Sequence, residues 1–526
     1  MKRSRRQLLI LPGIISAVLI AFVYSLTHET GRYPTLYWAM AKAISNNGYL
    51  IPKQINHFTA GGIPFGYPPL AFYTLAAVSD ITNLSYRFAS YYLRIIYFIG
   101  TPVTAYFLTT QFSNGRSASV ASVLIAVSSP IFLLHLGQGG FVRGLAFVLS
   151  LTTLTLATRA LKSSERRYYL TAGVVFGLTV LTHPTYAVFA GVGTASLWLG
   201  IDRSRSGFKI GATIAITGFL IASPWLLYVV TTHGPDIFFQ ASQTHGGLLS
   251  FTRHVNSLLS PPDSGIIERG IWVLGIGSLA VLAHERRYGL VVLFVGVGLM
   301  LGGRLRFTYT ILVISVSILI VEYLSRHFEQ NSISVKIDMT YFGKEQFHQV
   351  VPVFAAIFLL LPAVYAGIGG AEDLPKEPYS NADSEAVEWV RNSTSTNATF
   401  ITQFREEEFP YFANRTNLIV PWGAEWEGPE AFANQLRMKS EISGCQTAGC
   451  FSSFLQSSGY NPDYLYLYNE YINIESFNRN KSFEIVYQNK KVVIVKHMYD
   501  DVEHSSNDTA GIESRQVEMS GDRWSQ

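Results

Sequence analysis

The chain of 526 residues is 48% hydrophobic and only 14% charged, a balance that excludes an ordinary soluble protein and is typical of a chain that crosses a membrane many times. Its net charge of +4 is unevenly divided, because the residues after 370 hold 24 Asp and Glu against 13 Lys and Arg. We therefore expect a basic membrane domain over residues 1–370, an acidic soluble domain over 371–499, and a disordered polar tail over 500–526. No patch of basic and aromatic residues favours nucleic acid as a partner.

The first hydrophobic segment, residues 7–26, follows the basic sequence KRSRR. About 20 apolar residues suffice to cross a hydrocarbon core of about 30 Å. Because no small-residue cleavage site follows, we expect an uncleaved membrane span with its N-terminus in the cytoplasm. Residues 27–86 then form the first external loop, with short helices that lie against the membrane.

Residues 67–81 are apolar but number only about 15 and include Pro68 and Pro69, so they are too short for a span. We expect a juxtamembrane or re-entrant helix here, since counting it as a span would place the basic loop 159–167 outside, against the positive-inside rule. The C-terminal domain is then extracytoplasmic in a multi-pass cell-membrane protein. The expected spans number about eleven, at residues 7–26, 87–110, 117–135, 143–160, 168–182, 185–201, 209–230, 267–283, 288–302, 307–325 and 347–369.

Glu29 is the only carboxylate before Asp80 and lies at the outer border of the first span. Partial removal from water raises the pKa of a carboxylate and enables it to take a proton from a hydroxyl group. Glu29 is therefore a candidate catalytic base, although an acid that only caps a helix or reaches toward water fits the position as well. His28 beside it could contact an acceptor, but one His and one Glu do not make a metal site.

Three arginines lie on loops that the span assignment places outside, against the usual inward bias of positive charge. Arg304 and Arg306 occupy a turn in the sequence GGRLRF, and Arg143 follows the glycines of GQGGFVRG. Arginine forks match phosphate oxygens, so these residues could bind a lipid phosphate; ordinary contact with the membrane interface is the alternative. His183, in LTHPTY, lies at another outer helix end, where a structural histidine is the simpler interpretation.

The C-terminal domain has the pattern of a small α/β fold. We expect helices at residues 384–392, with Ser384 as N-cap, 430–441 and 451–458, and strands at 400–404, 418–422, 464–468, 483–487 and 492–496. The two cysteines of the chain, Cys445 and Cys450, are both here. They would close a small disulfide loop in an external domain and would be two inert thiols in a cytoplasmic one. The span assignment favours the disulfide.

The first loop carries its motifs in the order H-E, R-Y, A-K-A-I, N-G-Y-L-I-P and Y-P-P-L. This order resembles the polytopic glycosyltransferases of the GT-C superfamily, such as protein O-mannosyltransferases and lipid A aminoarabinose transferases. The resemblance implies transfer of a sugar, with inversion, from a polyprenyl-phosphate donor to a lipid, glycan or protein acceptor on the external face. It implies Glu29 as the base, with His28 where these enzymes carry an aspartate.

Tyr67 stands where the family has a basic residue beside Pro-Pro, so phosphate binding falls to arginines elsewhere. No metal ligand set is expected and no cofactor is certain, although a divalent metal stays open. The candidate site residues are Glu29 and His28 for catalysis, Arg304, Arg306 and Arg143 for the donor phosphate, and Arg32, Trp38, Tyr67 and His183 for the substrate cavity.

Two other classes of function are open at this stage. A lipid or polysaccharide transporter or flippase would place ionisable side chains near the middle of the membrane and carry internal repeats, whereas here the charges lie at helix ends and no repeat is evident. A non-catalytic membrane scaffold that displays an external domain would have no cavity joining Glu29 to the arginines.

Overall fold

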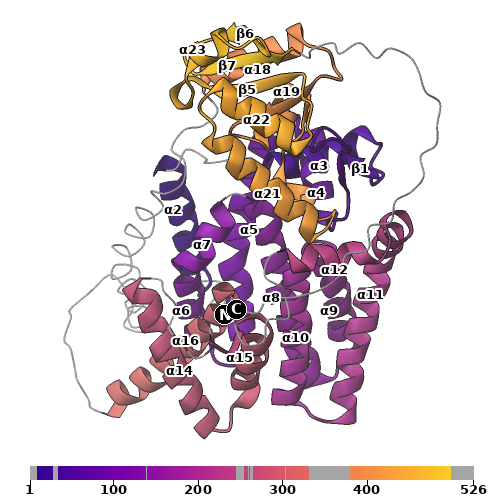
Figure 1. Cartoon of the computed structure of the whole chain (residues 1–526). Helices are drawn as coiled ribbons and strands as arrows, with labels where there is room; N and C mark the ends of the chain where they lie inside the picture. Colours follow the sequence, from indigo (N-terminus) through magenta and orange to yellow (C-terminus); the bar gives the residue numbers. More distant parts are fainter. Residues whose placement is uncertain are drawn as a thin grey trace, which may run out of the picture.

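The computed structural model describes residues 9–27, 34–137, 139–244, 254–256, 258, 260, 265–302, 304–330 and 380–498. Long helices form a membrane part, and a β-sheet domain built from the last of these ranges lies at one end of them (Figure 1). The first loop lies between the two, so the C-terminal domain rests on this loop as well as on helix ends.

The helices of the membrane part follow the hydrophobic segments of the sequence. The expected span over residues 117–135 is instead two helices, because Pro130 lies in the first turn of the second one, where its missing N–H and fixed φ favour a helix start. The helices are α2 (Leu11–Thr27), α5 (Tyr86–Thr109), α6 (Gly115–Ala126), α7 (Ser129–Leu136), α8 (Gly140–Ser163), α9 (Arg166–Val180), α10 (Pro184–Ile201), α11 (Arg205–His233), α12 (Asp236–Gln243), α14 (Ile266–His284), α15 (Tyr288–Leu301) and α16 (Leu305–Gln330).

Four of the described helices are long and apolar enough to cross a membrane. They are Gly140–Ser163, Arg205–His233, Ile266–His284 and Leu305–Tyr323. The expected count of eleven spans is therefore not confirmed, and the expected span at 347–369 lies outside the described residues. The protein is a multi-pass helical membrane protein with a C-terminal sheet domain.

Helix α8 lies at the centre of the membrane part and packs against α5, α9 and α10, while α10 packs on α15 and α16 packs on α14 and α6. Aromatic side chains fill the space between these helices: the rings of Phe189 and Phe307 stack with centroids 4.5 Å apart, and the Phe147 ring lies 5.9 Å from that of Tyr186. All four side chains are buried. This packing fixes α8, α10 and α16 relative to one another.

The first loop folds into α3 (Thr35–Asn46), β1 (Gln54–Ile55), β2 (Ile63–Pro64) and α4 (Leu70–Thr82) around its own buried core. The helix expected at 67–81 is thus present as α4, and it begins directly after Pro69. The backbone N–H of Leu70 donates to the carbonyl oxygen of Leu181 at 2.8 Å. This bond holds the start of α4 against the turn between α9 and α10.

The C-terminal domain is a five-stranded mixed sheet in the order β4-β3-β5-β7-β6. Strand β3 pairs in parallel with β4 and β5, and β7 pairs antiparallel with β5 and β6. Cys445 and Cys450 form a disulfide. The elements are α18 (Asn381–Ser393), β3 (Thr399–Thr402), α19 (Glu408–Ala413), β4 (Thr416–Asn417), α20 (Pro421–Ala424), α21 (Pro429–Gly444), α22 (Ala448–Ser458), β5 (Tyr464–Tyr468), η2 (Asn469–Tyr471), α23 (Ile474–Asn478), β6 (Phe483–Gln488) and β7 (Val492–His497).

Two sequence expectations for this domain are wrong. The strand expected at 418–422 lies earlier, at Thr416–Asn417, and Pro421 opens the short helix α20 instead, because proline cannot donate to a strand ladder. The N-cap of α18 is Ser380 rather than Ser384. Ser380 and Asp383 form a reciprocal capping box there.

Hydrogen bonds join the domain to the first loop. Asn417 of strand β4 pairs with Phe58 of the first loop in a parallel β-bridge. In this bridge, Thr59 N–H donates to the Asn417 carbonyl and Asn417 N–H donates to the His57 carbonyl, each at 3.0 Å. The Thr35 hydroxyl donates to the carbonyl oxygen of Glu407 at 2.8 Å. The domain is therefore seated directly on α3 and on the loop around His57.

Asp383 anchors α18 to the sheet. Its buried carboxylate accepts hydrogen bonds from Ser380 N–H at 2.9 Å and from the hydroxyls of Ser380 at 2.6 Å and Tyr468 at 2.9 Å, with Lys491 Nζ at 3.5 Å. Burial alone would raise the pKa of Asp383, but the Ser380 hydrogen bonds and the charges of Arg405 and Lys491 outweigh it and hold the pKa below its ordinary 3.8.

We expect the substitution Asp383→Asn to destabilise α18 by about 2–3 kcal/mol, because it weakens charge-assisted hydrogen bonds in a buried site. A carboxylate with a lowered folded pKa contributes its full stability above the ordinary value and loses it as pH falls through the lowered one. Hydrogen exchange of α18 in the full-length protein should therefore show protection that declines below about pH 4. Glu385→Gln, on the exposed face of the same helix, is the matched control; equal exchange in both variants would contradict this role.

Candidate active site

Four basic side chains converge beneath the C-terminal domain. Arg143 lies in the first turn of α8, Arg304 and Arg306 lie at the start of α16, and His183 is the N-cap of α10. Burial and the charges of Arg143, Arg306 and Arg304 together lower the pKa of His183 well below its ordinary value. His183 is therefore neutral at physiological pH, and the three arginines, each partly exposed, share one space with it.

Arg306 is more enclosed than Arg304. Its guanidinium lies 5.1 Å from the centroid of the Tyr186 ring and 4.6 Å from that of Phe307. Within the described part of the chain, its buried Nε–H has no hydrogen-bond acceptor. A buried donor without an acceptor is costly, so this side chain is suited to an anion that enters the site.

Glycine at the start of α8 brings the first loop to the arginines. Gly139 has φ +70°, and a Cβ there would lie 2.9 Å from Cε2 of Tyr37 on α3. A side chain at this position would push α3 away, so glycine is required both for the backbone conformation and for the close approach. Arg94 holds the same turn by donating to the carbonyls of Leu136 at 2.9 Å and Gly137 at 3.3 Å.

Aromatic rings form one wall of the site. The Tyr67 ring lies 5.6 Å from Tyr37 and 5.9 Å from His183, and His183 lies 5.1 Å from Tyr186. Burial raises the pKa of Tyr67 well above its ordinary value, and burial raises that of Tyr37 as well; the charge of Arg143 opposes both shifts. Both tyrosines are thus neutral hydroxyl groups that can donate or accept hydrogen bonds next to the cations.

The structure brings together five of the residues expected from sequence. They are Arg143, Arg304, Arg306, Tyr67 and His183. His28, Glu29 and Arg32 lie outside the described residues, so the structure does not place the expected base.

Trp38 has a different environment from the one expected. It is 2% exposed, its indole N–H donates to the Ser90 hydroxyl at 3.0 Å, and its ring lies 5.6 Å from Tyr411. These contacts place Trp38 in the core between the first loop and the C-terminal domain. Its neighbour Tyr37 is the α3 side chain that lies near Arg143 and contacts Tyr67.

The C-terminal domain supplies side chains that sequence reasoning missed. The ring of Trp426 lies 5.7 Å from that of Tyr67, and a Cβ at Gly66 would lie 2.6 Å from Trp426 Cε3, so glycine leaves room for this ring. The negative charge of Glu425 acts on both Tyr37 and Tyr67. No local pattern marks these residues, because they reach the site only through the docking of a domain encoded about 360 residues later.

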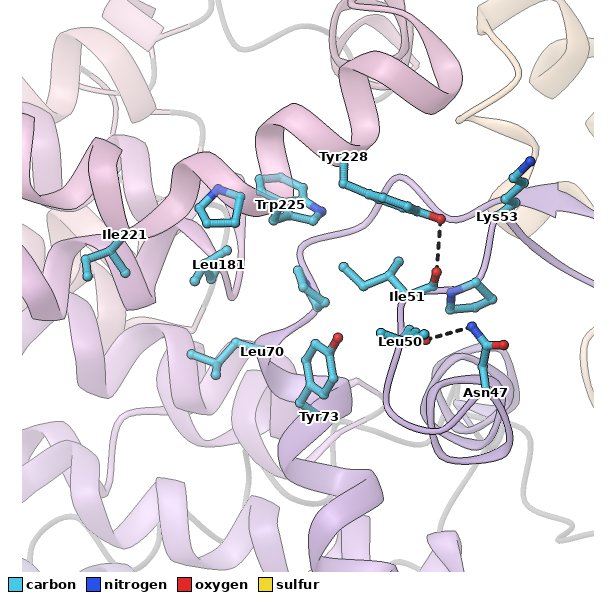
Figure 2. A pocket seen from close by; sticks show the side chains of 13 residues that line it. Asn47, Leu50, Ile51, Lys53, Leu70, Tyr73, Leu181, Ile221, Trp225 and Tyr228 are labelled. Atoms are coloured by element: carbon cyan, nitrogen blue, oxygen red, sulfur yellow. Dashed lines mark hydrogen bonds between the residues drawn. The ribbon is translucent and has the colours of Figure 1, made fainter.

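An apolar groove of about 750 Å³ adjoins this wall (Figure 2). It lies between the loop after α3, the start of α4 and helix α11, and both partners of the hydrogen bond between Leu70 and Leu181 line it. Tyr228 donates to the Ile51 carbonyl at 2.9 Å across one end. The lining residues are Asn47, Leu50, Ile51, Pro52, Lys53, Pro69, Leu70, Tyr73, Leu181, Ile221, Pro224, Trp225 and Tyr228.

The groove opens where apolar side chains are exposed. Leu50 is 69% exposed and Ile221 is 38% exposed, and Leu227 on the same helix is 63% exposed. Surface of this kind on a membrane helix faces lipid. In the described part of the chain, no group of three or more His, Cys, Asp or Glu side chains could hold a metal ion.

Comparison with known proteins places the chain in a family. A family model described as "6-pyruvoyl-tetrahydropterin synthase related domain; membrane protein" matches residues 66–364, which is more than half of the chain. The chain belongs to this family. The matched residues of this 6-pyruvoyl-tetrahydropterin synthase related membrane family include all three arginines, His183 and the groove residues from Pro69 onward. The groove residues at 47–53 lie before the match, and the C-terminal domain lies beyond it. A comparison of the sequence with curated proteins finds no match.

Solved structures show which fold this family member has. The archaeal oligosaccharyltransferase AglB from Archaeoglobus fulgidus, in complex with an inhibitory peptide and a dolichol-phosphate, matches 89% of this chain and 70% of its own length with a TM-score of 0.61 and 14% identity. ArnT from Cupriavidus metallidurans bound to undecaprenyl phosphate matches 92% of this chain and 97% of its own (TM-score 0.58, 12% identity). The arabinofuranosyltransferase AftD from Mycobacteria matches 94% of this chain but 40% of its own (0.60, 12%). The chain therefore has the GT-C fold of membrane glycosyltransferases.

Proposed function

We propose that this protein is a membrane glycosyltransferase that moves a sugar from a polyprenyl-phosphate donor to a hydroxyl group of a lipid, glycan or protein acceptor on the external face. The observation that supports this most directly is the cluster of three arginines around His183, together with an apolar groove whose lining includes Leu181, two residues before that histidine. Binding of a lipid phosphate requires cations for the phosphate group and an apolar surface for the lipid chain. The groove favours such a donor over the soluble heterocyclic substrate that the family description would suggest.

The reaction follows from the charges. The acceptor oxygen attacks the anomeric carbon while the bond between that carbon and the phosphate oxygen breaks, and the polyprenyl phosphate leaves with the electron pair. Arg304, Arg306 and Arg143 neutralise the charge that develops on the phosphate. Glu29, in the first loop, takes the proton from the acceptor hydroxyl. A single displacement of this kind inverts the anomeric carbon.

Two of the similar structures contain polyprenyl phosphates, which supports the donor class. Dolichol-phosphate is bound in the AglB complex and undecaprenyl phosphate in ArnT. The polyprenyl chain would occupy the groove beside Trp225 and Tyr228, and the acceptor would approach from the side of the C-terminal domain. That domain, residues 371–499, is then extracytoplasmic with the first loop, and the tail 500–526 lies outside the described residues.

The direct test is a transfer assay with the full-length protein in lipid nanodiscs. Polyprenyl phosphates that carry different labelled sugars are supplied singly, and label is followed into lipid, glycan and protein fractions. We expect one donor to yield a product whose anomeric configuration is opposite to that of the donor. In a second arm, the protein is reconstituted into sealed vesicles that contain the same donors. If label crosses the vesicle membrane there and no product forms in either arm, the protein is a flippase and the proposal fails. Loss of product in protein bearing Arg304→Gln with Arg306→Gln, prepared in the same way, would exclude contamination as the source of product.

Trp426 should control donor binding through Tyr67 and the groove. We expect Trp426→Ala to weaken binding of undecaprenyl phosphate by about tenfold, the effect of losing an aromatic contact of about 1.4 kcal/mol. Trp426→Phe keeps a ring and should restore most of the affinity. Trp422, which is 42% exposed on the same segment, provides the control variant Trp422→Ala. Equal binding by the Trp426 and Trp422 variants would contradict this contribution.

A further inference from the structure

A second cavity lies at the opposite end of the helices from the candidate active site. Helix α8 starts at Gly140 beside the site, and its 24 residues extend about 36 Å before they end near Lys162. There, a cavity of about 230 Å³ is bordered by the ends of α8, α10 and α14 and by the first turn of α15. The span assignment expects this face to be cytoplasmic.

The lining of this cavity contains three cations and no carboxylate. Arg287 is balanced, since its Nη1 lies 2.7 Å from Glu322 and 3.4 Å from Glu285, and its Nη2 donates to the Phe112 carbonyl at 2.7 Å. These bonds fix the turn between α14 and α15. Arg287 therefore stabilises the wall of the cavity, and its charge is neutralised by the two glutamates.

Lys162 and Arg286 carry the uncompensated charge. The Lys162 ammonium donates to the Gln111 carbonyl and lies 5.5 Å from the centroid of the Phe112 ring, so one of its three donors is used. Arg286 is exposed at φ +60°, and no described residue pairs with its guanidinium. The first turn of α15 borders the same space without an acidic residue or a side-chain cap, which adds positive potential.

The surface beside the cavity is apolar and continues along the helix. Tyr288 and Val295 are each 43% exposed and lie seven residues apart on α15, so they share one face over two turns. This face begins at the cavity and runs into the apolar length of the helix. A ligand with a phosphate head and acyl chains would match both the cations and this face.

We propose that Lys162 and Arg286 bind the phosphate group of an anionic membrane lipid on this face, at a site separate from the transfer reaction. Basic pockets between membrane helices are suited to such head groups. Free phosphate offers the same oxygen atoms, so the lipid and soluble sources must be separated by experiment.

Native mass spectrometry of the full-length protein in detergent would measure binding of phosphatidylglycerol and of phosphatidylcholine with identical acyl chains. A thermal-shift titration with inorganic phosphate forms the second arm. We expect preference for phosphatidylglycerol, weakened about tenfold or more by Lys162→Ala with Arg286→Ala. Arg166→Ala with Lys209→Ala removes the same charge from exposed positions elsewhere and should leave binding unchanged.

The outcomes separate clearly. One contrary outcome is that inorganic phosphate stabilises the wild-type protein but not the Lys162 and Arg286 double variant, while the wild-type protein shows no preference for phosphatidylglycerol. That outcome would assign the site to a soluble phosphate and overturn the lipid assignment. Equal loss in both double variants would show that only overall charge matters and would also overturn it. Arg286→Ala alone changes an exposed side chain without a described partner, so its partial loss of lipid binding supports the site even if the double variant folds poorly.

Discussion

Replacing Arg304 and Arg306 together by glutamine is expected to lower the rate of sugar transfer by about 10²–10³-fold. The two guanidinium groups share a space with Arg143 and a neutral His183, and the enclosed Arg306 has a buried Nε–H without a described acceptor. Glutamine keeps hydrogen-bonding capacity but removes the charge that stabilises a departing phosphate. The rate should be measured at saturating donor, so that a fall in kcat is separated from weaker donor binding.

The single variants sharpen this prediction. Arg306→Gln should be more damaging than Arg304→Gln, because Arg306 is the more enclosed and lies against the rings of Tyr186 and Phe307. Arg306→Lys should not restore the rate, since lysine lacks the planar fork that contacts two phosphate oxygens. Arg269→Gln, on the exposed surface at the start of α14, is the control. If the double variant and this control had equal rates, the arginine cluster would have no part in catalysis.

The substitution Glu29→Gln is expected to reduce transfer by about 10²–10⁴-fold, the contribution of a positioned general base. The amide keeps the size of the side chain and cannot take a proton. Donor binding should persist, because the arginines and the groove are unchanged. The measurement is kcat together with the binding constant for undecaprenyl phosphate, so that loss of chemistry is distinguished from loss of binding.

Asp80→Asn provides a matched control for Glu29. Asp80 is the next carboxylate along the chain, and it accepts hydrogen bonds from Ser45 at 2.8 Å and Tyr49 at 2.7 Å at the far edge of the first loop. We expect this variant to transfer sugar at nearly the wild-type rate. His28→Asp creates the acidic pair that the resemblance to the GT-C enzymes implies, and it should retain activity. A Glu29→Gln protein that transfers sugar normally would rule out Glu29 as the base.

Much of the fold could be predicted because hydrophobic length and periodicity depend on local sequence. The expected segments 209–230 and 464–468 correspond to α11 and β5, the latter residue for residue. The predictions were wrong where a single proline changed the secondary structure that the surrounding residues favour. Pro130 divided one expected span, and Pro421 replaced the end of an expected strand with a helical turn.

The site was predictable only in part. Arg143, Arg304 and Arg306 could be recognised because the span assignment places them on external loops, where they oppose the normal distribution of charge. Tyr37 and Trp38 are adjacent on α3, where successive side chains point about 100° apart, so the sequence cannot say which one faces the site. Trp426 contacts Tyr67 only because two domains dock, and neither local propensity nor spacing carries that information.

The parallel bridge between Phe58 and Asn417 has a consequence for the order of assembly. The contact between His57 and Thr416 spans 359 residues, so at about 5–20 residues per second the ribosome needs roughly 20–70 s to deliver the partner of the first loop. During that interval the backbone N–H of Thr59 and the carbonyl of His57 lack their partner Asn417. The residues of the apolar groove and the three arginines are synthesised before Trp426, which contacts Tyr67. If the proposed transfer reaction needs this contact, activity should arise only after the sheet domain at residues 380–498 has folded onto the first loop.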